Sequence, residues 1–245
     1  MDPKGRVALV TGGAVRIGRA ISVALAAAGA DVIIHYRNSK KDADKLRRIL
    51  KTFDVRSWVL QADLSSEAAC VDLIRRSIKT AGRLDMLVNN AAVFHKDSLR
   101  KTTEKKLLEE FWPNLFAPMI LMRAFAEHAK AGKIINLVDR RITSLDTEAV
   151  PYVLTKKALA ELTRIAALEF APSIAVNAVA PGAILPPPGK GMDYLEDKAG
   201  PIPLKRRCLP EEVADTVVFM MKNDAMTGQV VFVDGGQHLL GMVEA

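Results

Sequence analysis

Short runs of apolar, often β-branched residues alternate along the chain with longer segments whose apolar positions recur every three or four residues. The short runs are typical of buried strands, and the longer segments are typical of helices packed on a sheet. The pattern predicts strands at residues 7–10, 32–34, 57–60, 86–88, 134–138, 175–180 and 230–233, and helices at 17–28, 42–50, 68–79, 116–130, 153–170 and 211–221.

Strands that alternate with helices of this length indicate right-handed βαβ units, and hence a parallel sheet with helices on both faces. No repeat, linker or shift in composition divides the chain, so we predict one doubly wound α/β domain over residues 1–245. The one long irregular stretch is residues 181–203, which contains three consecutive prolines. We expect it to be a substrate loop, since loops of this length in compact domains are commonly lids or binding loops; a mobile surface insertion is the alternative.

Composition narrows the class of protein. Hydrophobic residues make up 49% of the chain and charged residues 26%, which is typical of a folded globular protein and argues against disorder. No apolar run approaches the roughly 20 residues that span a bilayer. The first strand begins too close to Met1 to leave room for a signal peptide. We therefore expect a cytoplasmic protein without a membrane partner.

Cysteine, histidine and charge patterns narrow the chemistry further. Cys70 and Cys208 are too few for a metal cluster or a disulfide framework, and the four histidines have no ligand spacing, so we expect no metal. The net charge of +7 suits nucleic acid, an anionic membrane or small anions. Because long basic runs are missing and aromatic residues are only 5% of the chain, we expect a phosphate-bearing small molecule rather than nucleic acid.

A glycine-rich turn joins the first predicted strand to the first predicted helix. It runs from Thr11 to Gly18 and contains Gly12 and Gly13. Such a turn lets backbone N–H groups approach a pyrophosphate at the positive end of the helix. The segment resembles the phosphate turn of short-chain dehydrogenases/reductases, with Arg16 in place of the middle glycine. The pteridine reductase branch of that family has the same replacement, and there the arginine reaches the cofactor phosphate and the substrate.

This resemblance implies a Rossmann-like fold that binds a nicotinamide dinucleotide. An NAD site usually has a carboxylate after the second strand. Here Arg37 and Ser39 stand in that segment and can hold a 2′-phosphate, so NADP(H) is favoured. A merely solvated arginine is the alternative. The cofactor-binding residues that these arguments and the resemblance imply are Gly12, Arg16, Ile17, Gly18, Tyr36, Arg37, Asn38, Ser39, Asp63, Leu64, Asn90, Ala91, Lys156, Pro181 and Gly182.

The tyrosine–lysine signature of the family does not identify the catalytic tyrosine by spacing alone. All three tyrosines (Tyr36, Tyr152 and Tyr194) have a lysine four residues later. Only Tyr152 begins a helix after the fifth strand, where the nicotinamide is expected, and a helix places Lys156 on the same face. A nearby ammonium favours the phenolate, so we expect Lys156 to bring the tyrosine pKa closer to operating pH.

Asn114 matches the asparagine that bends a helix in the family and holds a water in the proton relay; a helix cap is the alternative. The intact set of Asn114, Tyr152 and Lys156 predicts an active oxidoreductase. A catalytically silent NADPH-binding regulatory protein on the same fold is an alternative.

Asp139 departs from the serine that most of the family has thirteen residues before the tyrosine. An ionised carboxylate only accepts hydrogen bonds, so it suits a substrate with N–H donors better than a carbonyl. Pteridine reductases have aspartate at this position and an aromatic residue at the position of Phe94, which stacks a pterin on the nicotinamide. Ala92, by contrast, replaces a serine of those enzymes.

Arg16, Phe94, Asp139 and Tyr152 therefore predict NADPH-dependent reduction of a pterin or a related ring C=N bond. The alternative is a ketone or 3-oxoacyl-thioester reductase, and Arg140 or Arg141 could instead make Asp139 a structural ion-pair partner. The two longest apolar helices, 116–130 and 153–170, have more apolar surface than one sheet face covers. Together with the habit of the family, this predicts a homotetramer or homodimer.

Overall fold

The computed structural model describes residues 1–186, 189–191, 193–198 and 200–240. The strands are Val7–Val10 (β1), Asp31–Tyr36 (β2), Ser57–Gln61 (β3), Met86–Asn89 (β4), Gly132–Leu137 (β5), Ile174–Pro181 (β6) and Val230–Val233 (β7). The helices are Arg16–Ala27 (α1), Lys40–Leu50 (α2), Glu67–Ala81 (α3), Glu104–Phe111 (α4), Ala117–His128 (α5), Val150–Glu169 (α6), Asp193–Lys198 (α7), Pro210–Lys222 (α8) and Gln237–Leu240 (α9).

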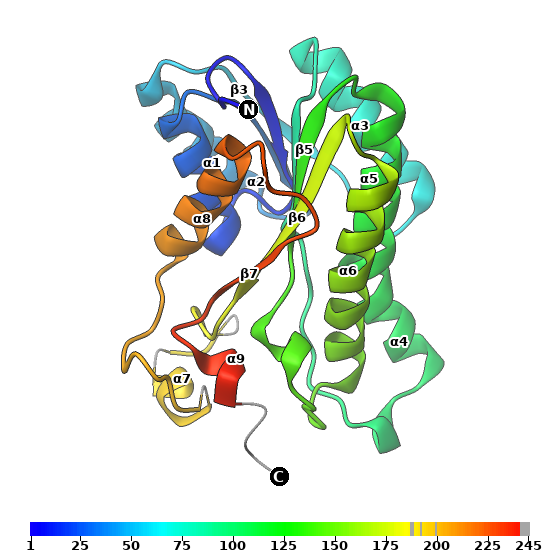
Figure 1. Ribbon diagram of the computed structural model, residues 1–245, viewed down its shortest axis with the longest axis vertical. Coiled ribbons are helices and arrows are strands. Elements are labelled where there is room, and N and C mark those ends of the chain that lie inside the picture. The colour runs from blue at the N-terminus through cyan, green and yellow to red at the C-terminus, as the bar shows by residue number, and fades with distance from the viewer. Residues whose placement is uncertain (187–188, 192, 199, 241–245) are drawn as a thin grey trace.

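Within these residues the strands form one seven-stranded parallel sheet in the order β3-β2-β1-β4-β5-β6-β7. Helices α1, α2 and α8 cover one face and α3, α5 and α6 cover the other, as Figure 1 shows. Chain order reverses between β1 and β4, and ligands of open parallel sheets bind at the carboxyl ends of the strands beside such a reversal. The predicted doubly wound α/β fold is confirmed.

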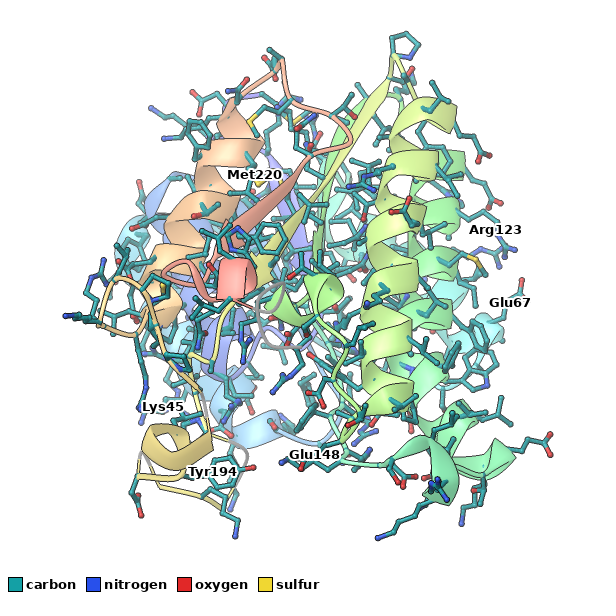
Figure 2. The ribbon with its side chains drawn as sticks, turned by 60° about the horizontal axis from the view of Figure 1, so that its bottom comes forward. Lys45, Glu67, Arg123, Glu148, Tyr194 and Met220 are labelled. Atoms are coloured by element: carbon teal, nitrogen blue, oxygen red, sulfur yellow. The ribbon has the colours of Figure 1, made fainter. Side chains whose placement is uncertain are left out.

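Burial along the strands explains why each reads as a continuous apolar run. In β1, Ala8 and Val10 pack on the side of α1 and α8, whereas Val7 and Leu9 pack on the side of α3 and α5. Neighbouring residues of a strand point to opposite faces, so a sheet covered on both faces buries every one of them. Helices within one layer are also joined at the surface. Figure 2 shows one such contact, where Arg123 on α5 donates a hydrogen bond of 2.6 Å to Glu67 on α3.

The structure departs from the predicted elements in two places that concern the site. The segment 181–203, predicted to be irregular, contains the short helix α7, and part of that segment (residues 187, 188, 192 and 199) lies outside the described residues. Helix α4 and the π-helical turn Trp112–Phe116 that follows it were not predicted. The apolar side of α4 is short and half-exposed (Leu108 is 44% exposed), so its periodicity is weak.

In the described part of the chain, no helix has both the length and the apolar character needed to cross a membrane.

Candidate functional site

A cleft of about 1000 Å³ lies along the carboxyl ends of β1 to β4. Its walls come from the turn after β1, the ends of β2 and β3, the segment after β4, helix α4 and the start of α6. The lining residues that the sequence also predicted as cofactor or substrate residues are Gly12, Arg16, Ile17, Gly18, Arg37, Asp63, Leu64, Asn90, Ala91 and Tyr152.

The glycine turn at the cleft has the close backbone packing that a phosphate turn needs. A Cβ on Gly18 would clash with the carbonyl oxygen of Gly12 and would lie 2.5 Å from Nδ2 of Asn90. Gly12 has φ +59° and Arg16 has φ +56°, both in the left-handed region that glycine adopts without cost. This backbone conformation explains why glycine is usual where Arg16 stands. The turn therefore fits a dinucleotide pyrophosphate.

The side chains of Asn90 and His35 hold the backbone of this turn through hydrogen bonds. Asn90 donates from Nδ2 to the carbonyl oxygens of Thr11 (2.8 Å) and Gly12 (3.2 Å). His35, at the end of β2, accepts the Gly12 N–H on Nδ1 at 3.1 Å, and its Nε2 lies 3.1 Å from the carbonyl oxygen of Ala62. Both contacts require a neutral ring protonated on Nε2. Burial, the largest cause, lowers the pKa of His35 to about 4.

His35 is expected to make the protein less stable in acid. Its pKa is lower in the folded state (about 4) than in the unfolded chain (6.5), so its contribution is complete above pH 6.5 and is lost as the pH falls toward 4. The free energy of unfolding should fall by about 3 kcal/mol more in the wild type than in His35→Asn, which keeps an acceptor but cannot titrate. Urea unfolding between pH 7 and 4 measures this, with the exposed His128→Asn as the control. An equal acid loss in wild type and His35→Asn would contradict it.

The remaining predicted cofactor residues after β2 divide between the cleft and its surroundings. Arg37 is exposed and lines the cleft, whereas Tyr36, Asn38 and Ser39 lie outside its lining. Ser39 directly precedes α2. Lys40, four residues after Tyr36, is exposed and donates a hydrogen bond of 2.7 Å to Asp44.

The helix-start tyrosine meets the predicted aspartate in the interior. Tyr152, the third residue of α6, donates from its hydroxyl to Oδ2 of Asp139 at 2.9 Å. Lys156 lies one turn later, with Nζ 5.8 Å from the centroid of the Tyr152 ring and 2.8 Å from the carbonyl oxygen of Leu137. Tyr152 and Lys156 are 8% and 3% exposed, so both polar groups function outside bulk water. Tyr194, by contrast, lies on α7 at the lower end of the view in Figure 2.

The pKa of Tyr152 differs from the expectation that the nearby ammonium of Lys156 would lower it. Burial, followed by the charge and hydrogen bond of Asp139, raises the pKa of Tyr152 well above 10. Burial also lowers the pKa of Lys156 to about 8, although Asp139 opposes that change. The expected lowering of the tyrosine pKa is therefore wrong for this arrangement, because desolvation and a neighbouring carboxylate both favour the neutral phenol. A neutral phenol remains a proton donor at physiological pH.

Asp139 also has an arginine partner. Its Oδ1 accepts the backbone N–H of Arg141 at 2.8 Å, and its Oδ2 lies 3.5 Å from the Arg141 guanidinium. Arg141 in turn donates to Asp146 and lies 5.3 Å from the centroid of the Phe94 ring. Phe94 packs edge-on against Tyr152, with ring centroids 4.8 Å apart. The five side chains of Asp139, Arg141, Asp146, Phe94 and Tyr152 thus form one cluster, in which Asp139 contacts both the tyrosine and the arginine.

Asn114 lies in the π-helical turn Trp112–Phe116 and is fully buried. Its Oδ1 accepts the Val93 N–H at 2.9 Å, and its Nδ2 donates to the Val93 carbonyl at 3.0 Å and to Glu110 at 2.7 Å. These bonds tie the bend of the helix to the segment that follows β4. The sequence suggested Arg141 only as one of two possible ion-pair partners of Asp139, and the structure places it 3.5 Å from that carboxylate. It did not single out Glu110, because only burial and contacts distinguish Glu110 from other charged residues.

The loop after β6 contacts the phosphate turn. The Arg16 guanidinium donates to the carbonyl oxygens of Pro186 (2.7 Å) and Leu185 (3.3 Å). Pro181 is buried, and a Cβ on Gly182 would lie 2.8 Å from Cα of Asp234, so this segment packs closely on the sheet edge. Arg16 therefore connects the two segments that the sequence predicted to hold cofactor and substrate.

Comparison with known proteins places the chain in a family. A family model described as enoyl-(acyl carrier protein) reductase matches residues 13–238. Pteridine reductase 1 of Leishmania tarentolae is 33% identical in an alignment 283 residues long, gaps included, that covers 97% of this chain and 98% of the relative. The granaticin polyketide synthase putative ketoacyl reductase 2 of Streptomyces violaceoruber is 31% identical, with 97% and 98% covered.

Among solved structures, FolM alternative dihydrofolate reductase 1 from Brucella suis, in complex with NADP, superposes with a TM-score of 0.91. It is 33% identical, and the match covers 98% of this chain and 97% of that one. The chain belongs to the short-chain dehydrogenase/reductase family and is an oxidoreductase of that family.

Proposed function

We propose that this NADP-dependent oxidoreductase reduces a ring C=N bond of a pterin-like substrate with NADPH. The observation that carries the proposal is the hydrogen bond of 2.9 Å from the Tyr152 hydroxyl to Asp139, because it joins the proton donor to a carboxylate at the position where most of the family has a serine. A carboxylate accepts hydrogen bonds from ring or amino N–H groups. The pteridine reductase and the alternative dihydrofolate reductase among the similar proteins support the same substrate class.

The residues around the cleft divide the work of binding and proton transfer. The turn from Gly12 to Gly18 would hold the pyrophosphate, with Arg37 at the 2′-phosphate and Asp63 and Leu64 at the adenine. NADPH, when bound, supplies the hydride. Lys156 would hold the nicotinamide ribose, and Phe94 would contact the flat face of the substrate. Tyr152 remains protonated because its pKa is raised, so it can give its proton to the reduced nitrogen.

Arg37 is expected to decide the choice between NADPH and NADH. In Arg37→Asp, a carboxylate would repel the 2′-phosphate and accept hydrogen bonds from a ribose hydroxyl. NADPH should bind roughly ten- to hundredfold more weakly, as for the loss of a charged hydrogen bond, and the preference should invert. Fluorescence titration of both cofactors measures this, with Arg48→Asp on the exposed side of α2 as the charge control. A wild type that binds NADH more tightly would refute the charge argument.

A second function, reduction of a ketone or a 3-oxoacyl thioester, is suggested by the putative ketoacyl reductase among the relatives. It would need a donor for the substrate carbonyl other than ionised Asp139, because a carboxylate repels developing alkoxide charge. Oxidation of NADPH against matched panels of dihydropterins, folates, quinones, simple ketones and 3-oxoacyl esters tests both functions. Turnover of ketones and 3-oxoacyl esters without pterins would overturn the first proposal.

We also propose that the enzyme is a homodimer or homotetramer. Leu154, Ile165 and Leu168 on α6 are 46%, 59% and 84% exposed, and Met119 on α5 is 44% exposed. Large apolar side chains left exposed on α5 and α6 are typical of a surface covered by a second copy. Light scattering on the purified protein measures the mass, and a monomer at micromolar concentration would contradict this.

A further inference from the structure

A buried carboxylate stands directly behind the helix bend at the site. Glu110, the seventh residue of α4, is 2% exposed. A carboxylate removed from water needs several hydrogen-bond donors to remain ionised. Glu110 has three: its Oε1 accepts from the backbone N–H and from Nδ1 of His95, each at 2.7 Å, and its Oε2 accepts from Nδ2 of Asn114 at 2.7 Å.

These bonds leave Asn114 with one orientation. Its Oδ1 accepts from Val93, one N–H donates to Val93, and the other donates to Glu110. A flipped carboxamide would place its oxygen against the Glu110 carboxylate and the Val93 carbonyl oxygen, and its N–H against the Val93 N–H, so the flip costs all three hydrogen bonds. Val93 belongs to the wall of the cleft. The Glu110 carboxylate therefore supplies one of the three hydrogen bonds that fix how the helix bend meets that wall.

His95 connects this buried group to solvent. Its side chain is 66% exposed, whereas that of Glu110 is 3% exposed. For Nδ1 to donate to the carboxylate, His95 must carry a proton on Nδ1, either as the neutral tautomer or as the imidazolium. The pair thus consists of a buried carboxylate and a solvent-exposed imidazole, joined by a hydrogen bond of 2.7 Å.

We infer that Glu110 and His95 are positioning residues: ionised Glu110 holds Asn114 in its working orientation beside Tyr152 and Lys156, and His95 holds Glu110 ionised. The inference rests on the proposed roles of Asn114, Tyr152 and Lys156 in the reaction. It adds two residues that touch neither the expected substrate nor the reacting atoms.

Protonation of Glu110 would release the bend. Burial raises the pKa of Glu110, and the hydrogen bonds and charge of His95 oppose that rise. Tyr152 and Lys156, both on α6, also interact electrostatically with Glu110. On its own helix, Lys106 lies one turn earlier and pairs with Asp97 at 2.8 Å. Once protonated, Glu110 would present an O–H to a site that holds only donors, so one of its three hydrogen bonds would break. Turnover should therefore fall on the acid side as Glu110 takes up a proton.

The test is the pH dependence of kcat, measured with the best substrate of the panel. In His95→Ala the backbone N–H remains but the ring donor is lost, so the pKa of Glu110 rises and the acid limb of kcat should move to higher pH. His95→Asn places an amide donor near the position of Nδ1, so the limb should stay close to that of the wild type. Glu110→Gln should lower kcat about tenfold or more at every pH, because the bend is no longer held, while NADPH binds as before.

Glu127→Gln and His128→Ala, exposed on α5, are the matched controls and should leave kcat and its pH profile unchanged. A purely structural role would lower the melting temperature of the variants without moving the acid limb. The inference would be overturned if the acid limb of kcat in His95→Ala stays at the wild-type pH, or if Glu110→Gln keeps full kcat. If Glu110→Gln does not fold, the comparison of His95→Ala with His95→Asn decides alone. A wild type that turns over no substrate, or an active Tyr152→Phe, would instead refute the proposed function.

Discussion

Replacement of Tyr152 by phenylalanine is expected to lower kcat by about 10²–10⁴-fold, the usual effect of losing a positioned proton donor. The substitution removes the hydroxyl that lies 2.9 Å from Asp139 and keeps the ring that packs against Phe94. NADPH affinity should change little, because the cofactor contacts assigned to the glycine turn and Arg37 remain. Single-turnover oxidation of NADPH, together with a fluorescence titration of the cofactor, separates the two effects.

Tyr194→Phe is the matched control, since this tyrosine also has a lysine four residues later but lies on α7. It should retain wild-type turnover. If Tyr152→Phe keeps most of its activity, the proton comes from another group. If it loses NADPH binding as well, the ring is a structural part of the cofactor cleft rather than a donor.

Substitution of Asp139 should separate the two candidate substrate classes. Asp139→Ser is expected to weaken pterin reduction strongly, because a hydroxyl replaces the carboxylate that would accept from ring or amino nitrogen. Activity toward simple ketones should be retained or increased, because a hydroxyl can donate to a carbonyl. Steady-state rates with one dihydropterin and one ketone are measured on the same preparation. Their ratio decides between the two substrate classes.

Asp139→Asn separates charge from shape in the same assay. It keeps the size of the side chain and an oxygen for the Arg141 N–H, but it cannot ionise. If both variants reduce dihydropterin as fast as the wild type, the contacts of Asp139 with Arg141 account for its presence, and the carboxylate is structural. The pterin proposal would then depend on Arg16 and Phe94 alone.

The order of strands and helices could be predicted from the sequence because each depends on a local period. Strands buried on both faces, such as β1, appear as continuous apolar runs, and the long helices appear as repeats of three and four. The glycine turn could be located for the same reason, since a left-handed backbone at Gly12 leaves a mark in the residue type. The short helix α4 and the π-helical turn could not be predicted in this way, because neither has a clear apolar period or a characteristic residue type.

The choice of Tyr152 among three tyrosines also came from the sequence, through its place after the fifth strand. The sequence did not determine how the chosen residues affect one another. Tyr152 and Asp139 are thirteen residues apart, and Glu110 and His95 fifteen; only the packed structure brings each pair within hydrogen-bond distance.

Burial then decides the electrostatics. From the sequence, Lys156 was expected to lower the tyrosine pKa, whereas in the fold desolvation and Asp139 raise it. Residue types and local periods thus determined the seven strands, the helices α1, α2, α3, α5, α6 and α8, and the candidate groups. Distance and exclusion of water, which depend on the whole fold, decided which groups meet and which of them carry charge.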